Sequence, residues 1–304
     1  MLYITTRNKN DAFTAYRTAR NDIAPDGGCF VPFRLPVYTP AEIENFRGMS
    51  FSDVLAQMMK TFFSARFSGM DLEMSIGRNL MKIVPLGQRI VAAELWHNMD
   101  SSLEYIIRKL YTKVFPEEKG TPTEWFRIAV AIAVLFGCYA AADTKDIVDI
   151  AVSTEDMTIP VAAWYARKMG LPLGTIVYAC EEDSVLWSLL YRGSCNAFRV
   201  EKTAGLERLI AGSLGLEEAN RFVRLTQEGR IYTVPEEELE AFQKGSFVAA
   251  IGAARLESVT KSVERTDSYR IDDSFAAAYG SLQDYRASTG ESRVALLLAT
   301  KAPR

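Results

Sequence analysis

The strongest constraint on the fold lies in residues 146–180, where a strand pattern, a helix pattern and a second strand pattern follow one another. Asp146 to Ser153 (DIVDIAVS) has the β-rich composition of a strand, and Ile159 to Met169 has the composition of a helix. A Gly-then-Pro stop beginning at Gly170 ends that helix before the apolar run Thr175 to Cys180. Two strands joined through a helix run parallel in one sheet. The sequence therefore predicts an α/β fold with a parallel sheet.

The longest apolar run, Ile128 to Ala142, lies just before this unit. It is only about half to three quarters of the roughly twenty residues that span a bilayer. Apolar residues fall all round it, and only its ends, Arg127 and Asp143, are charged. This pattern is typical of a central core helix, whereas a surface helix is amphipathic.

Other elements follow from the same periodicities, and a Pro-, Gly- and charge-rich segment, Phe115 to Pro122, is the best candidate for a linker. A last strand is expected at Val294 to Ala299. Further helices are expected at Ser184–Tyr191, Leu216–Thr226, Pro235–Gln243, Val248–Glu264 and Asp273–Tyr285.

Composition narrows the classes of partner. The 304 residues are 48% hydrophobic and 24% charged, which is ordinary for a globular protein of one large domain or two modest ones. The net charge of −3, with no run of basic residues, gives no electrostatic footprint for a nucleic acid or an anionic membrane, and we expect neither as a partner. Charged residues interrupt the first twenty positions, so we expect no signal peptide and a cytoplasmic protein.

Cysteine and histidine usage argues against metal chemistry. The four cysteines have no CxxC or Cys/His spacing, as expected of buried thiols in a reducing compartment, and we expect no metal site. The single histidine argues against a serine triad or a Cys/His dyad. The cysteines are Cys29, Cys138, Cys180 and Cys195.

The N-terminal region carries two specific motifs. Tyr3-Ile-Thr-Thr-Arg7 is followed by Ala24-Pro-Asp-Gly-Gly-Cys-Phe-Val-Pro32. Together they resemble the N-terminal domain of threonine synthase, which has a Tyr-x-Ser-Thr-Arg stretch before Ala-Pro-Asp-Gly-Gly-Leu-Tyr-Val-Pro. Phe51 to Phe63 also resembles a helix of that domain, and its apolar residues fall on one face, as core packing requires.

Three later blocks extend the resemblance along nearly the whole chain: Thr123–Tyr139, Val152–Pro172 and Ile271–Thr300. The resemblance implies a fold-type II pyridoxal-phosphate enzyme, with a mainly helical N-terminal domain (1–85) and a large α/β domain (86–304). Between Tyr111 and Pro122 the family inserts a small lid domain, for which a dozen residues leave no room. We therefore expect the lid to be deleted.

The resemblance places the cofactor-binding lysine of the family at Glu104, in His97-Asn-Met-Asp-Ser-Ser-Leu-Glu104. A carboxylate cannot form the imine that a neutral amine forms with the cofactor aldehyde. Lys109 is rotated about 140° from Glu104 around a helix, so it does not present an amine to the same place. Arg108 shares the helical face of Glu104. The carboxylate is therefore either half of an exposed ion pair with Arg108 or part of a new pocket.

The family's phosphate loop, Ser-Gly-Asn-Phe-Gly, corresponds to Thr154-Glu155-Asp156-Met157-Thr158. Both glycines are replaced, and two acids are present. A carboxylate about 4 Å from a phosphate charge costs roughly 4 kcal/mol near a surface, whereas a helix N-terminus returns only about 0.3–1 kcal/mol to an anion. We therefore expect pyridoxal phosphate binding to be lost. A self-capped helix is the simpler account of the same residues.

Other positions of the expected cleft have less specific signals. The resemblance places Thr300 where the family's threonine meets the cofactor ring, although a threonine at a strand end is also ordinary. Cys180 is a weak candidate nucleophile, because it ends a buried strand beside acids, which disfavours the thiolate. His97, with Asp100 and Glu104, forms the one remaining candidate for acid/base or metal chemistry if the segment is helical, and a buried, hydrogen-bonded histidine is the alternative.

These substitutions predict a catalytically inactive threonine synthase-like pseudoenzyme that binds a protein or a ligand. The expected remnant cleft contains His97, Glu104, Arg108, Thr154, Glu155, Asp156 and Thr300. We expect no catalytic residue and no cofactor. A divergent threonine synthase-like enzyme, or one repurposed to work without pyridoxal phosphate, is the alternative. Loss of the lid predicts exposed apolar surface and a homo-oligomer, and a genuine threonine synthase is another candidate partner.

Overall fold

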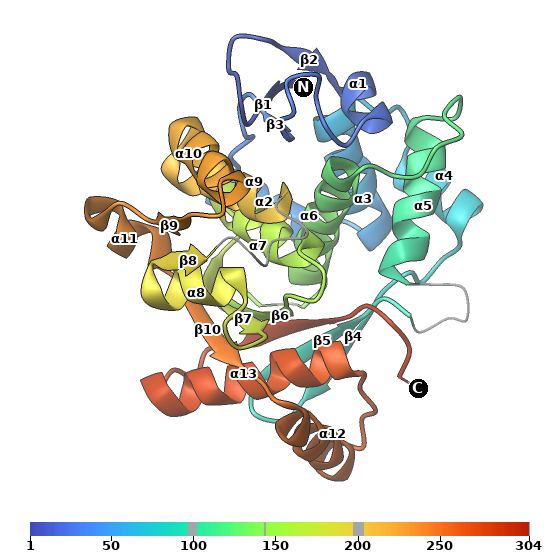
Figure 1. The fold of residues 1–304 in the computed structure, drawn as a ribbon. Coiled ribbons are helices and arrows are strands. Elements are labelled where there is room, and N and C mark those ends of the chain that lie inside the picture. Colours follow the sequence, from blue (N-terminus) through green and yellow to red (C-terminus); the bar gives the residue numbers. More distant parts are fainter. Residues whose placement is uncertain (97–101, 143, 197–203, 304) are drawn as a thin grey trace.

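The structure, a computed structural model, describes residues 1–96, 102–142, 144–196 and 204–303. Its centre is a six-stranded sheet (Figure 1). Every neighbouring pair of strands is parallel except β4 and β5, which are antiparallel. The α/β class predicted from the sequence is confirmed. Across the sheet the order is β10 (Ser246–Ala250), β7 (Leu173–Cys180), β6 (Val148–Ser153), β11 (Ala295–Ala299), β5 (Ile90–Glu94) and β4 (Lys82–Leu86).

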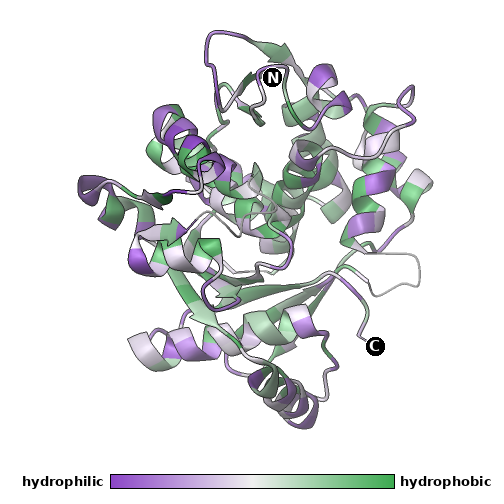
Figure 2. Cartoon of the chain, in the orientation of Figure 1, coloured by the Kyte–Doolittle hydropathy of each residue, from purple (hydrophilic) through white to green (hydrophobic). Residues whose placement is uncertain are grey.

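The sheet separates two hydrophobic clusters, because successive side chains of a strand point to opposite faces. Ile150 and Ile176 belong to the larger cluster, whereas their neighbours Ala151 and Val177 belong to the smaller one. Helices α12 and α13 cover the second face, below the sheet in Figure 1. Both faces are therefore covered, which explains why the central strands read as nearly continuous apolar runs, and why the strands are coloured hydrophobic along their length in Figure 2.

The remaining elements pack around this sheet. Two small sheets accompany it, of order β2-β1-β3 and β8-β9. Their strands are β1 (Leu2–Thr5), β2 (Phe13–Thr14), β3 (Phe30–Pro32), β8 (Ser194–Asn196) and β9 (Ile231–Thr233). The helices are α1 (Ala15–Arg20), α2 (Pro40–Arg47), α3 (Phe51–Phe63), α4 (Gly69–Ile76), α5 (Leu103–Val114), α6 (Glu124–Ala141), α7 (Thr158–Lys168), α8 (Val185–Arg192), α9 (Ala204–Leu214), α10 (Leu216–Gln227), α11 (Glu236–Gln243), α12 (Ala253–Asp267) and α13 (Asp273–Thr289).

Helix α6 is the buried helix predicted from the apolar run. By length and composition alone it would suffice to cross a membrane, but 83% of its apolar window is buried inside the structure. Phe136 of this helix makes edge-on contacts with Tyr38 and Phe46, both from the N-terminal region. These contacts identify α6 as the core helix on which the N-terminal region packs.

The N-terminal region shares its core with the rest of the chain. Met58 and Phe62 of α3 lie in the same hydrophobic cluster as α6. The division into domains 1–85 and 86–304 stays a prediction, and strand β4 straddles that boundary while pairing with β5. Residues 115–123 join α5 directly to α6.

One predicted helix is wrong at its start. Residues 246–250 form β10, which pairs with β7, and α12 begins only at Ala253. The misplaced segment, Val248-Ala-Ala, has a composition that suits a strand or a helix, so pairing with β7 decides its state. The other expected helices and the final strand are present with ends shifted by a few residues at most.

Gly170 holds the N-terminal region against the end of α7. Its φ of +97° is a conformation that L residues rarely adopt. An added Cβ would collide with the backbone carbonyl oxygen of Tyr38. The Tyr38 N–H in turn donates to the Met169 carbonyl oxygen at 2.8 Å. Only glycine permits this close approach of the two segments.

We predict that Gly170→Ala lowers the free energy of unfolding by more than about 2 kcal/mol, because the cost of positive φ, about 1–2 kcal/mol, is added to the collision. Urea denaturation measures this difference. Gly290→Ala is a matched control, with φ +73° and open space around the added Cβ. It should lower the free energy of unfolding only by the cost of positive φ. Gly48→Ala, at φ −84°, should be nearly neutral. Equal losses for Gly170 and Gly290 would contradict the proposed collision.

Candidate functional site

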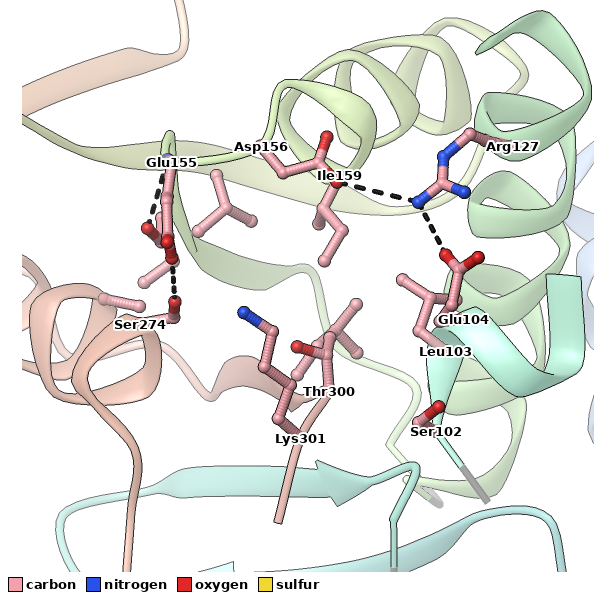
Figure 3. A pocket seen from close by; sticks show the side chains of 15 residues that line it. Ser102, Leu103, Glu104, Arg127, Glu155, Asp156, Ile159, Ser274, Thr300 and Lys301 are labelled. Carbon is pink, nitrogen blue, oxygen red and sulfur yellow. Dashed lines mark hydrogen bonds and ion pairs between the residues drawn. The ribbon is translucent and has the colours of Figure 1, made fainter. Parts of the chain in front are cut away.

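A cavity of about 270 Å³ lies where β6 and β11 end. This is the edge of a parallel sheet at which α/β proteins bind ligands. Figure 3 shows the side chains that surround it. They come from the loop after β6, the first turns of α5 and α13, helix α6 and the end of β11. The polar lining consists of Ser102, Glu104, Arg127, Ser153, Glu155, Asp156, Ser274, Thr300 and Lys301.

Glu104 lies in the first turn of α5, whose N-cap is Ser102. The Ser102 hydroxyl accepts the Tyr105 N–H at 3.0 Å, which starts the helix at this point. The Glu104 carboxylate forms ion pairs with Arg108 at 2.8 Å and with Arg127 at 2.7 Å. The sequence left two alternatives for Glu104, an ion pair with Arg108 or a place in a pocket. In the structure Glu104 both forms the ion pair and lines the pocket.

The two arginines also set the protonation of Glu104. Partial burial alone would raise its pKa, but hydrogen bonds from Arg127 and Arg108 outweigh this effect and leave the pKa below its usual value. The carboxylate is therefore ionised at neutral pH. Its negative charge is already compensated by the protein.

The polar side chains of the loop before α7 bind within the protein. The Asp156 carboxylate accepts the Thr158 N–H at 2.8 Å and lies 3.9 Å from Arg127. Thr154 Oγ1 donates to the Ala179 carbonyl oxygen at 3.0 Å and lines a neighbouring cavity of about 740 Å³ instead of this one. The self-capped helix expected from the sequence is not found: the N-cap of α7 is Met157, which makes no side-chain cap hydrogen bond, and Asp156 accepts only the N–H of the first helical residue.

Sequence reasoning missed five polar residues of the pocket lining: Ser102, Ser153 and the following three. Arg127 appeared only as the charged start of an apolar helix, and Lys301 only as the neighbour of Thr300. Ser274, the third, donates from its hydroxyl to Glu155 Oε2 at 2.8 Å. The isolated charge of Arg127 at the start of α6 was a usable signal, because a single cation beside a buried helix requires a partner.

Of the other candidate groups, one lies outside the described residues and one lies away from the described pocket. His97, together with Asp100, lies outside the described residues. Cys180 is buried, which raises the pKa of its thiol to about 11. The thiol is therefore protonated at neutral pH, and it is a poor nucleophile. The described residues contain no group of three or more metal-ligating side chains.

Comparison with known proteins agrees with this architecture. Residues 2–79 match the family model described as threonine synthase N terminus. The PLP-bound threonine synthase from Brucella melitensis superimposes with a TM-score of 0.85 at 15% identity, covering 100% of this chain and 89% of that one. The chain has the fold of this threonine synthase structure, and the family match extends over residues 2–79.

Two further threonine synthases have similar structures. The yeast protein gives a TM-score of 0.83 at 16% identity, covering 99% of this chain and 87% of that one. The Escherichia coli protein gives 0.74 at 12% identity, covering 100% and 89%. No curated protein matches the chain in sequence. At such identities the similarity establishes the fold, and activity depends on the residues of the site.

Pyridoxal phosphate, which the threonine synthase resemblance implies, does not fit this set of side chains. The Thr158 N–H that starts α7 is occupied by the carboxylate of Asp156. Glu155 places a second carboxylate on the same loop. At the position assigned to the lysine, Glu104 is held by two arginines. The phosphate group of the cofactor would be repelled by the carboxylates of the loop. The aldehyde group of the cofactor would find no amine at Glu104 with which to form an imine.

We predict that Glu104→Gln lowers the free energy of unfolding at pH 7 by about 0.5–1 kcal/mol, a value limited by the solvent exposure of the ion pairs. Since the folded pKa of Glu104 is lowered, this contribution is complete above about pH 4.5, the ordinary value for glutamate. It disappears as the pH falls through the folded pKa. Urea denaturation of both proteins between pH 3 and pH 7 measures it.

Glu257→Gln is the matched control for this prediction. It removes an exposed i,i+4 pair with Lys261, to which the described part of the chain adds no second cation, and its effect at pH 7 should be smaller. A loss for Glu104→Gln that persists unchanged at pH 3 would show that packing, and not charge, is responsible.

Proposed function

We propose that this threonine synthase-like protein is a pseudoenzyme, which retains the fold and uses the remnant cleft to bind an unphosphorylated ligand or a protein. The observation that carries the proposal is the state of Glu104. Its carboxylate lines the pocket at the position that the resemblance assigns to the lysine, and Arg108 and Arg127 hold it there. Such a group cannot hold the cofactor covalently.

The acidic loop supports the same proposal. Asp156 binds one N–H at the start of α7, that of Thr158, with a carboxylate of the chain itself, and a helix N-terminus is the place where phosphates bind. The pocket therefore needs no phosphate to complete its charge balance. We place the protein in the cytoplasm, with a homo-oligomer or a genuine threonine synthase as candidate protein partners.

We predict that incubation with pyridoxal phosphate, followed by borohydride reduction and peptide mass mapping, gives no stoichiometric adduct confined to one peptide. Lys301 is the lysine at which an adduct would be most informative, because its amine lines the pocket beside Thr300. Lys301→Met is the matched variant, since an adduct that vanishes with this substitution would locate it in the pocket. A stoichiometric adduct on one lysine would refute the pseudoenzyme proposal and favour a divergent enzyme, with threonine formation from O-phosphohomoserine as the next assay.

We also predict self-association through exposed apolar side chains. Met70 and Met74 of α4 are 71% and 83% exposed and lie one helical turn apart. Sedimentation velocity should show a dimer or larger species that dissociates in the double variant Met70→Glu/Met74→Glu. Met49→Glu, at a methionine that is 41% exposed, is the control. A wild-type protein that stays monomeric at high concentration contradicts the expected oligomer.

A further inference from the structure

The charges around the pocket do not all cancel within the protein. Glu104 and Asp156 are compensated by Arg108 and Arg127, at distances of 2.7–3.9 Å. The two remaining ionic groups of the lining are Glu155 and Lys301. Neither has an oppositely charged partner within 4.0 Å among the residues that the structure describes. The pocket thus presents one carboxylate and one ammonium group that are not joined in an ion pair, and Lys301 also interacts electrostatically with Asp272, the N-cap of α13.

These two groups come from different elements and face the same space. Glu155 lies on the loop after β6, where the Ser274 hydroxyl donates to its carboxylate at 2.8 Å and fixes its position. Lys301 follows the end of β11, and Figure 3 shows its ammonium group directed into the pocket. Their separation exceeds the 4.0 Å limit of an ion pair. Both groups line the same cavity of about 270 Å³.

Apolar side chains form the rest of the lining. Ala151 and Ala278 are buried, and Ile159 and Leu298 add branched surface beside them. The cavity of about 270 Å³ is smaller than the roughly 300–1,000 Å³ of pockets for drug-sized ligands. A complementary molecule is therefore small, carries one charge of each sign, and has a short aliphatic body.

We propose that the pocket binds a small unphosphorylated zwitterion with a branched aliphatic side chain, of the branched-chain amino acid type. Its amine contacts Glu155, and its carboxylate contacts Lys301. Charge-assisted hydrogen bonds to these groups supply orientation, and the apolar lining receives the side chain. Asp156 is less suited to the amine, because it already accepts the Thr158 N–H. This inference rests on the proposed binding role of the same pocket.

The test is isothermal titration of the full chain with L-valine, L-leucine and L-isoleucine. Two truncated forms of valine serve as matched controls: isobutylamine lacks the carboxylate, and 3-methylbutanoate lacks the amine. We expect at least one of the three amino acids to bind, and the best of them to bind tenfold or more tightly than either truncated molecule. Binding no tighter than the truncated molecules, or no binding by any of the three, overturns the proposal.

Two variants assign the contacts. Glu155→Gln should weaken amino acid binding about tenfold and leave 3-methylbutanoate unaffected, whereas Lys301→Met should weaken the amino acid and leave isobutylamine unaffected. Glu257→Gln and Lys261→Met, a remote acid and base on α12, should change nothing. If Glu155 and Lys301 instead neutralise each other through water, amino acid affinity will not depend on either residue, which also overturns the proposal.

The outcome is separable from that of the pseudoenzyme proposal. If no amino acid binds and no pyridoxal phosphate adduct forms, only the proposal that the pocket binds a zwitterion is refuted. A site-selective adduct on one lysine removes the pseudoenzyme proposal, whatever the titration shows.

Discussion

The insertion of β11 between β5 and β6 is the interaction on which the rest of the structure depends. β11 is the last strand of the chain, and it pairs in parallel with β5 on one side and with β6 on the other. Without it, the pair β4-β5 would have no contact in the sheet with β6, β7 and β10. The same strand ends at the pocket, where Thr300 and Lys301 follow directly. The pairing that completes the sheet therefore also brings the last polar residues of the cleft to the loop after β6.

Arg127 joins the charged side chains of the site, much as β11 joins the two parts of the sheet. From the first turns of α6 it reaches Glu104 of α5 and Asp156 of the loop before α7. Three segments that are distant in sequence are thereby tied together by one guanidinium group, whose Nη2 lies near both carboxylates. The compensation is internal, so the cleft does not require a bound anion to be electrostatically balanced. This arrangement differs from a phosphate site, where the anion itself completes the balance.

Local patterns predicted much of the fold because they reflect burial directly. The unit β6-α7-β7, the buried helix α6 and the amphipathic α3 each have enough residues for an unambiguous period. Strands β4, β5 and β10 were not expected, since each has five residues and the last two contain alanines that suit either state. Their conformation is decided by neighbours in the sheet, which no local window contains.

The residues of the site also fall into those that the sequence located and those that it did not. The resemblance located Glu104, Glu155, Asp156 and Thr300, all of which line the cavity. Arg127 could not be linked to Glu104, because the contact depends on how α5 packs against α6. That packing is itself fixed at the connection between the two helices: Tyr111 donates to the Ala19 carbonyl oxygen at 2.9 Å, Thr123 to that of Thr18 at 2.8 Å, and Arg20 pairs with Glu118 at 2.6 Å. Helix α1 thus secures both ends of the short 115–123 connection. The short connection is therefore an integral part of the fold, and the cleft has the geometry that α5 and α6 impose on it.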